Sequence, residues 1–187
     1  MIGHMGQKRG QWETLSSKIV HKNPYYWVRE DTVIKPDGSK GFYNVVESNG
    51  AVFIVALDDK QNVYLIGLHR YTNDNYSIEL PAGGMGDDDP LTAAKRELQE
   101  ETGMVAKKWK ELGLIYPANG LLSENNYVFI ATDLHPAKDN EQKEEGIDTV
   151  LKVPFKEAFR MIKRGEINDT QTIAPLTMAA LELGYLD

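Results

Sequence analysis

The sequence predicts an α/β fold in which a mixed β-sheet lies between helices. Short apolar runs that suit strands alternate with segments of helical period, as in α/β proteins. Ala51–Leu57 is a continuous apolar run of the kind that is buried on both faces of a sheet. Residues 90–102 have a helical pattern with a capping residue at each end.

The first 50 residues predict an antiparallel β extension. Strands are expected at Tyr25–Val33 and Gly41–Val46, and Pro36-Asp37-Gly38 between them is a strong turn sequence. We expect this extension, residues 1–50, to precede a main domain over residues 51–187.

The main domain begins after a turn at Asn49-Gly50, which leads into the apolar run. The polar segment His135–Gly146 has no apolar period and is expected to be a long loop, and long loops are often functional. Further strands are expected at Val63–Leu68, Ser77–Leu80, Trp109–Tyr116, Tyr127–Thr132 and Asp148–Val153, and helices at Phe155–Lys163 and from about Asp169 to Leu183.

The helix over residues 90–102 has the clearest boundaries. Asp89 is placed as its N-cap, Pro90 occupies the first helical position, and Gly103 follows the last turn. We expect its core-facing side to be opposite the face that carries its carboxylates. The expected core residues are Leu91, Ala94 and Leu98.

Composition excludes several classes of function. The chain has 187 residues with 28 acidic and 21 basic side chains, a net charge of -7 and no basic tract. Binding to nucleic acid or to an anionic membrane is therefore not expected. Because there is no cysteine, disulfides, thiolate catalysis and zinc–thiolate sites are excluded.

A cytoplasmic location is the default expectation. No apolar run is long enough to span a bilayer, and the N-terminus has no apolar signal region. Residues 1–5 are expected to be a remnant of cloning. The lack of cysteine would also be compatible with an oxidising compartment, so the default depends on the absence of a signal alone.

Three carboxylates of the helix predict a metal site. Glu97, Glu100 and Glu101 share one helical face and repel one another unless a cation lies among them. Hard oxygen ligands suit Mg²⁺ or Mn²⁺, and Mg²⁺ usually completes its shell with water and substrate phosphates. The alternative is a solvated face on which Arg96 pairs with Glu100.

The segment Gly83–Met104 resembles the Nudix box, Gly-x5-Glu-x7-Arg-Glu-U-x-Glu-Glu-x-Gly-U, in which U is a bulky aliphatic residue. The second half matches at every defined position, from Arg96 to Met104. The first half differs, since four residues separate Gly83 from Asp88 and aspartate replaces glutamate. The resemblance implies a Nudix-type α/β/α sandwich.

The resemblance also implies the metal ligands and the reaction. Glu97, Glu100, Glu101 and the backbone carbonyl of Ala82 would bind Mg²⁺, with Mn²⁺ as a possible substitute, and Arg96 would orient the carboxylates. The implied reaction is substitution at phosphorus in a pyrophosphate.

Features outside the box resemble the branch of the family that hydrolyses ADP-ribose and nucleoside diphosphate sugars (NDP-sugars). Arg70 and Glu79, which precede Pro81-Ala82-Gly83, would bind substrate. The catalytic base of this branch lies on the late loop, where Glu144 and Glu145 are candidates and Glu145 is preferred. Asn119 replaces the proline that marks ADP-ribose specificity, which favours a broader range of NDP-sugars.

Four further residues are implied in substrate binding. Tyr26 and Trp27 would stack on a nucleobase, although aromatic residues in a strand are more often packing residues. Ser123 and Glu124 keep the pattern of the branch. The resemblance also implies a homodimer in which the N-terminal strands complete the base site.

Two other functions remain open. The chain could be a Nudix hydrolase for another substrate, such as a nucleoside triphosphate or a dinucleoside polyphosphate. It could also be a Nudix-fold ligand sensor without catalysis, although such proteins usually lack box glutamates that this chain keeps.

Overall fold

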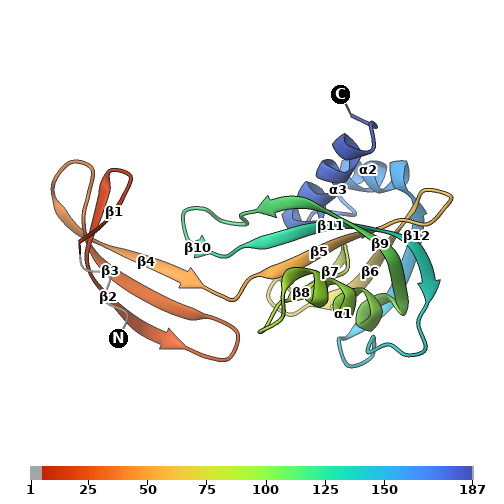
Figure 1. Cartoon of the computed structure of the whole chain (residues 1–187), viewed down its shortest axis with the longest axis horizontal. Helices are drawn as coiled ribbons and strands as arrows, with labels where there is room; N and C mark the ends of the chain where they lie inside the picture. The colour runs from red at the N-terminus through yellow and green to blue at the C-terminus, as the bar shows by residue number, and fades with distance from the viewer. Residues whose placement is uncertain (1–5, 187) are drawn as a thin grey trace. The chain divides into compact units, whose positions relative to one another are not determined.

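The strands and helices belong to two units, each with its own sheets (Figure 1). The computed structural model describes residues 6–186, so the expectation for residues 1–5 lies outside the described part. One unit comprises Met1–Asn49 and Tyr116–Glu124, and the other comprises Gly50–Ile115 and Asn125–Asp187. The predicted α/β class is confirmed, with a mixed sheet and helices in the second unit.

The first unit contains a five-stranded sheet in the order β1-β2-β3-β4-β10. Its β3–β4 hairpin confirms the predicted turn, in which Gly38 has a φ of 81° and Asp37 accepts a hydrogen bond from the Ser39 amide at 2.9 Å. β10 is the parallel member and pairs with β4. The strands are β1 (Gln7–Arg9), β2 (Trp12–Lys22), β3 (Trp27–Ile34), β4 (Lys40–Glu47) and β10 (Leu122–Ser123).

The second unit contains a four-stranded sheet, β8-β5-β11-β9, and a three-stranded sheet, β12-β6-β7. The first of these is mixed, because β11 runs parallel to β5 and antiparallel to β9. Its strands are β8 (Ala82–Gly84), β5 (Ala51–Ala56), β11 (Asn126–Pro136) and β9 (Met104–Ile115). The smaller sheet contains β12 (Ile147–Pro154), β6 (Asn62–Arg70) and β7 (Asn75–Glu79).

Strand β5 separates two apolar cores. Val52 and Ile54 pack with α1 (Pro90–Thr102), whereas Val55, on the opposite face, packs with α2 (Phe155–Arg164) and α3 (Thr170–Glu182). The alternation follows from the two-residue period of a strand. All three residues are fully buried, which confirms that both faces of this strand are covered.

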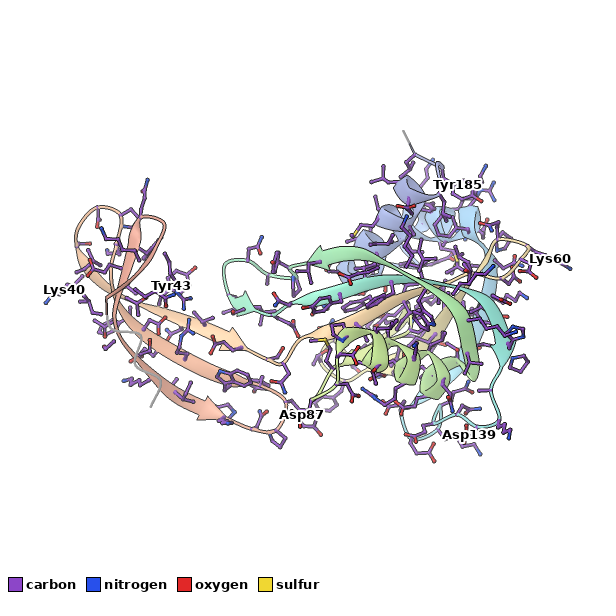
Figure 2. All side chains as sticks on the ribbon, in the orientation of Figure 1. Lys40, Tyr43, Lys60, Asp87, Asp139 and Tyr185 are labelled. Atoms are coloured by element: carbon purple, nitrogen blue, oxygen red, sulfur yellow. The ribbon has the colours of Figure 1, made fainter. Side chains whose placement is uncertain are left out.

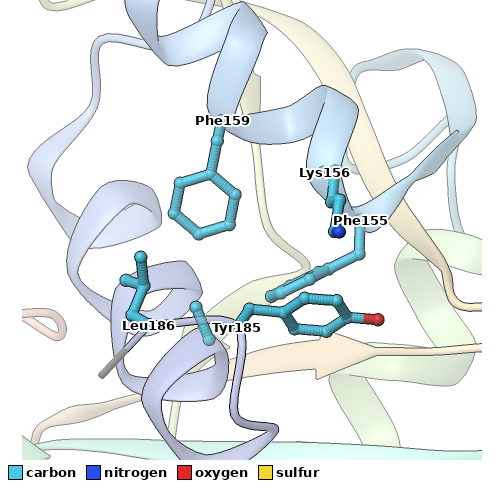
Figure 3. A pocket seen from close by; sticks show the side chains of 6 residues that line it. Phe155, Lys156, Phe159, Tyr185 and Leu186 are labelled. Carbon is cyan, nitrogen blue, oxygen red and sulfur yellow. The ribbon is translucent and has the colours of Figure 1, made fainter.

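The two C-terminal helices enclose a small cavity of about 170 Å³ together with the residues that follow α3 (Figure 3). Tyr185 packs on Phe155, with 5.3 Å between ring centroids, and Phe159 contacts Phe155 edge to face at 5.5 Å. Gly165 ends α2 with a φ of 77°, as its sequence position predicts. Within residues 6–186, no helix has the length and apolar character needed to span a bilayer.

Strand lengths differ from expectation around the late loop. β11 continues to Pro136, so the loop comprises Ala137–Gly146 and excludes His135. The cause is the partner strand β9, which begins at Met104 and offers backbone groups to His135 and Pro136. Ladder hydrogen bonds thus extend both strands beyond the apolar residues that predicted them.

Candidate active site

The caps of α1 fix the rotation of its carboxylate face. The Asp89 side chain accepts hydrogen bonds from the amides of Leu91 and Thr92, each at 3.1 Å, and Pro90 begins the helix. Gly103 ends it in the left-handed conformation, with a φ of 67°. Both predicted caps are confirmed, and between them the three glutamates occupy the expected spacing on one face.

The short strand β8 lies against the carboxylate face. The amide of Ala82 donates a hydrogen bond of 2.7 Å to Oε2 of Glu101. At Gly83 an added Cβ would overlap the carboxylate of Glu97, so a side chain there would displace that carboxylate. Because β8 covers this face, Glu97 and Glu101 are buried, although the sequence placed the core on the opposite side at Ala94 and Leu98.

Arg96 connects the carboxylates to the preceding loop. Its Nη1 donates to Glu97 at 2.7 Å and to Glu100 at 2.9 Å, and its Nη2 donates to the carbonyl of Gly84 at 2.9 Å. Asp88 lies 3.5 Å from Nε of the same arginine. The predicted orienting residue therefore contacts two of the three box glutamates directly.

The buried glutamates have perturbed pKa values. Burial raises the pKa of Glu101 to about 8, and the nearby carboxylates of Glu97 and Glu145 add to the increase. Burial likewise raises the pKa of Glu97, partly offset by Arg96. Negative charge at this face is therefore only partly compensated by the protein's own cations.

The donor set has the chemistry of a divalent-cation site. Among residues 6–186, no three His, Cys, Asp or Glu side chains already converge in the arrangement of a metal centre. Instead, Arg96 binds two carboxylates and an amide binds the third. Hard carboxylate oxygens whose charge is only partly compensated suit Mg²⁺ or Mn²⁺, so the residues fit such an ion.

The late loop is attached to the same helix. The Gln99 side chain donates to Asp139 at 2.6 Å, and the Glu141 amide donates to the carbonyl of Glu100 at 2.8 Å. Figure 2 labels Asp139 in this loop, below α1. Farther along the loop, Glu145 is close enough to raise the pKa of Glu97 and Glu101, as noted above. The loop thus brings the charge of one of its two candidate bases to act on two of the box glutamates.

Arg70 and Glu79 form a two-point ion pair at the ends of β6 and β7. Nε and Nη2 of Arg70 donate to the two carboxylate oxygens of Glu79 at 2.9 and 2.5 Å. Burial opposes ionisation of Glu79, but the hydrogen bonds from Arg70 and Ser77 outweigh it and lower its pKa. The hydrogen bond to Glu79 raises the pKa of Arg70, and the charges of Glu101 and Asp169 contribute.

Four other predicted site residues gather in the first unit. Trp27 on β3 and Ser123 on β10 are both register partners of Glu47 on β4, and the Trp27 indole donates to Glu47 at 2.6 Å. Glu124 follows β10 and accepts from the Ser48 hydroxyl at 2.8 Å. Tyr26, which precedes β3, is 41% exposed, so part of this residue is accessible to a ligand.

Comparison with protein families decides the classification. The family described as "NUDIX domain" matches residues 48–175, which is more than half of the chain. The chain belongs to the Nudix family. The family described as "Nucleoside diphosphate sugar hydrolase N-terminal domain" matches residues 12–46 of this Nudix hydrolase.

Curated relatives and a solved structure agree with this classification. The Nudix hydrolase is 37% identical to an ADP-ribose pyrophosphatase of Mycobacterium tuberculosis, over 93% of this chain and 86% of the relative. It is 35% identical to a GDP-mannose pyrophosphatase of Enterobacter sp., over 67% and 70% of the two chains. A crystal structure described as an ADP compounds hydrolase has the same fold, with a TM-score of 0.82, 20% identity and coverage of 96% and 97%.

Two residues at the Nudix site were not predicted from the sequence. Asp139 lies in the expected loop, but nothing in a polar loop sequence shows which residue bonds to a helix 40 residues away. Thr172 belongs to the first turn of α3, where Ser and Thr are common for local reasons. The hydrogen bond that its hydroxyl accepts from the Leu80 amide is long-range and has no local sequence signal.

Proposed function

We propose that this Nudix hydrolase cleaves the pyrophosphate bond of NDP-sugars, such as ADP-ribose, GDP-mannose and ADP-glucose, in a Mg²⁺-dependent reaction. The products would be a nucleoside monophosphate and a sugar phosphate. The observation that carries the proposal is the face of α1 on which Glu97 and Glu101 are buried beside Arg96 and the late-loop Glu145. Relatives named ADP-ribose and GDP-mannose pyrophosphatase support the substrate class.

The metal would be held by Glu97, Glu100, Glu101 and the carbonyl of Ala82. When bound, Mg²⁺ supplies positive charge that offsets the diphosphate and favours ionisation of an attacking water. Arg96 would hold the carboxylates in register, since it already bonds two of them. Mn²⁺ prefers similar oxygen ligands and would be a possible substitute.

Glu145 would act as the general base. In this role its carboxylate accepts a proton from water as the water oxygen bonds to phosphorus and the bond from phosphorus to the bridging oxygen breaks. Glu144 is the neighbouring alternative on the same exposed stretch of the loop. The proximity of Glu145 to Glu97 and Glu101 supports the choice of Glu145.

Arg70 would bind the diphosphate. Nε and Nη2 are engaged by Glu79, and the guanidinium has five N–H donors in a planar fork, so donors on Nη1 remain for phosphate oxygens. Glu79 would then hold the guanidinium of Arg70 in a fixed orientation. Both residues were predicted as substrate-binding, and their ion pair supports a shared role.

The first unit would bind the nucleoside and form a homodimer. Tyr26 and Trp27 could stack on the base, and Ser123 and Glu124 lie near the strand partner of Trp27, Glu47. The match of residues 12–46 to an N-terminal domain of NDP-sugar hydrolases supports this assignment.

The decisive experiment measures hydrolysis of ADP-ribose, GDP-mannose, ADP-glucose, diadenosine polyphosphates and dGTP by chromatography, with Mg²⁺ and with EDTA. We expect Mg²⁺-dependent turnover that is fastest on the diphosphate sugars. If dGTP or the diadenosine polyphosphates are hydrolysed faster than the diphosphate sugars, the proposed substrate class is wrong and theirs takes its place. No turnover of any of them by folded protein with either metal would instead indicate a ligand sensor.

A further inference from the structure

A hydrogen bond ties the first turn of α3 to the strand that carries Glu79. The hydroxyl of Thr172 accepts from the Leu80 amide at 3.1 Å. Both residues are 1% exposed, so water does not compete for this amide. Because the two residues are 92 positions apart, the contact belongs to the tertiary fold.

The residue before Leu80 is the one that holds Arg70. Glu79 receives both hydrogen bonds of the arginine fork, and its backbone is joined directly to the amide that Thr172 fixes. β7 ends at Glu79, so the ladder with β6 does not pair residues beyond that point. The Thr172 hydroxyl therefore holds the backbone at the point where pairing between β6 and β7 ends.

Loss of this acceptor would have a local cost. A buried amide without a partner keeps its full desolvation penalty, so the chain shifts to find another acceptor. A shift at Leu80 changes the direction of the Glu79 side chain. The planar fork of Arg70 tolerates little misalignment, because its two hydrogen bonds require both carboxylate oxygens.

The same turn also carries a carboxylate, that of Asp169. Asp169 is the N-cap of α3, yet its side chain makes no capping hydrogen bond. Its backbone carbonyl accepts from Thr172 and Ile173, which fixes the turn to the helix. The charge of Asp169 acts on Arg70, so the turn anchored by Thr172 lies close to the arginine.

We propose that Thr172 is a positioning residue whose hydroxyl, through Leu80 and Glu79, orients Arg70 for the substrate diphosphate. The substrate part of this inference rests on the proposed function. The orientation of Arg70 is a property of the free protein and can be measured without turnover.

The test compares wild type with Thr172→Val, Thr172→Cys and Thr172→Ser. Valine keeps the shape and removes the acceptor, cysteine keeps a small side chain with a weak acceptor, and serine keeps the hydroxyl. Thr177→Val is the matched control, because Thr177 lies in the same helix and its hydroxyl donates within that helix, to the carbonyl of Ile173 at 2.8 Å. Thr172→Cys also serves if the valine variant does not fold.

Two readouts are measured for each variant. The first is the solvent exchange rate of the Arg70 Nε–H by NMR, which reports its hydrogen bond to Glu79. The second is the split between KM and kcat on ADP-ribose. We expect Thr172→Val and Thr172→Cys to raise exchange and KM at least fivefold while kcat changes less than threefold. Thr172→Ser and Thr177→Val should stay within twofold of wild type.

Unchanged Arg70 exchange in the valine and cysteine variants would overturn the proposal, as would an equal effect of Thr177→Val. If wild type turns over no NDP-sugar, the proposed function fails, and the exchange measurement still decides the role of Thr172. If the valine and cysteine variants lower kcat but leave KM and the exchange rate of the Arg70 Nε–H unchanged, the role of Thr172 is merely structural. That result would also overturn the proposal.

Discussion

Glu144 and Glu145 are adjacent in the sequence but have different relations to the α1 carboxylates. Both are exposed on the late loop, and Glu145 lies near enough to Glu97 and Glu101 to raise their pKa values. A base must be within reach of the attacking water, and that water must be near the metal ligands. Position within the loop, and not residue type, therefore separates the two candidates.

Glu145→Gln is expected to lower kcat on ADP-ribose by at least 100-fold, the usual order for loss of a general base. Glu144→Gln is the matched control and should keep kcat within about threefold. Steady-state kinetics at saturating Mg²⁺ measures both. The reverse pattern would assign the base to Glu144.

The stability of the metal-free protein should depend on pH through Glu101. Its pKa is about 8 in the fold and near 4.5 when unfolded, so the folded state retains a proton that the unfolded state loses. The contribution is complete below pH 4.5 and is lost as pH rises toward 8, amounting to a few kcal/mol at most, about 1.4 per pKa unit. The negative charges of Glu97 and Glu145 favour the protonated form of Glu101, and the positive charge of Arg70 opposes it.

Urea unfolding in EDTA between pH 5 and 8 measures this effect. The free energy of unfolding should fall across the range in wild type and stay flatter in Glu101→Gln. Glu111→Gln, a change at an exposed position of β9, is the control and should follow wild type. A slope that persists in Glu101→Gln would assign the proton to another group.

At the scale of elements, the contact of β8 with α1 builds the site. The strand approaches the helix so closely that a Cβ at Gly83 would overlap the Glu97 carboxylate, whereas Gly84, next to it, has open space around its position. A side chain at Gly83 would therefore move the Glu97 carboxylate, whereas one at Gly84 would not.

Gly83→Ala should displace the Glu97 carboxylate, lowering kcat at least tenfold and weakening Mg²⁺ activation. Gly84→Ala is the control and should remain within about twofold of wild type, since its Cβ meets nothing within 4 Å. Mg²⁺ titration of the initial rate checks both. Equal activities of the two variants would show that the close approach is not needed.

Sequence predicts an element well where its signals are local. The α1 boundaries agree with the structure because Asp89 and Gly103 act on neighbouring backbone groups. β2 escaped prediction because most of its residues are exposed, so no buried face gives an apolar period. β8 was missed because three small residues carry no strand signal, and its role depends on a helix encountered later in the chain.

The candidate site likewise has a part that the sequence predicts from local spacing and a part that depends on contacts between distant residues. The box glutamates and Arg96 share one helix, so helical spacing brings them together. Burial of Glu97 and Glu101 depends on β8, and the bond from Thr172 to Leu80 spans 92 positions. Such contacts are fixed by topology, which residue spacing along the chain does not encode.

At the scale of the whole molecule, the proposed homodimer concerns the first unit. This unit exposes large apolar side chains, among them Phe42 at 71% and Ile19 and Val20 at 51% each. Exposed apolar groups of this size favour association with another surface. A second copy of the chain is the proposed partner.

Light scattering after gel filtration should give twice the chain mass of 21.1 kDa for wild type. Phe42→Asp should weaken the dimer and shift the mass toward that of one chain at low concentration. Leu181→Asp, at a 53% exposed position of α3, is the control and should leave the dimer intact. A wild-type protein that is monomeric at every concentration would refute the dimer.

The first unit is assembled from two separate stretches of chain, and β10 from the second stretch pairs with β4 from the first. The backbone therefore passes between the units at Asn49–Gly50, Ile115–Tyr116 and Glu124–Asn125. A protease that cuts only the first junction would leave the fragments interlocked by β-pairing, and they would separate in denaturant. A gene fragment that starts at residue 50 would still encode β10 and would leave it without its partner strand. Evolutionary exchange of the N-terminal unit would thus require a matching change in the β9–β11 connection.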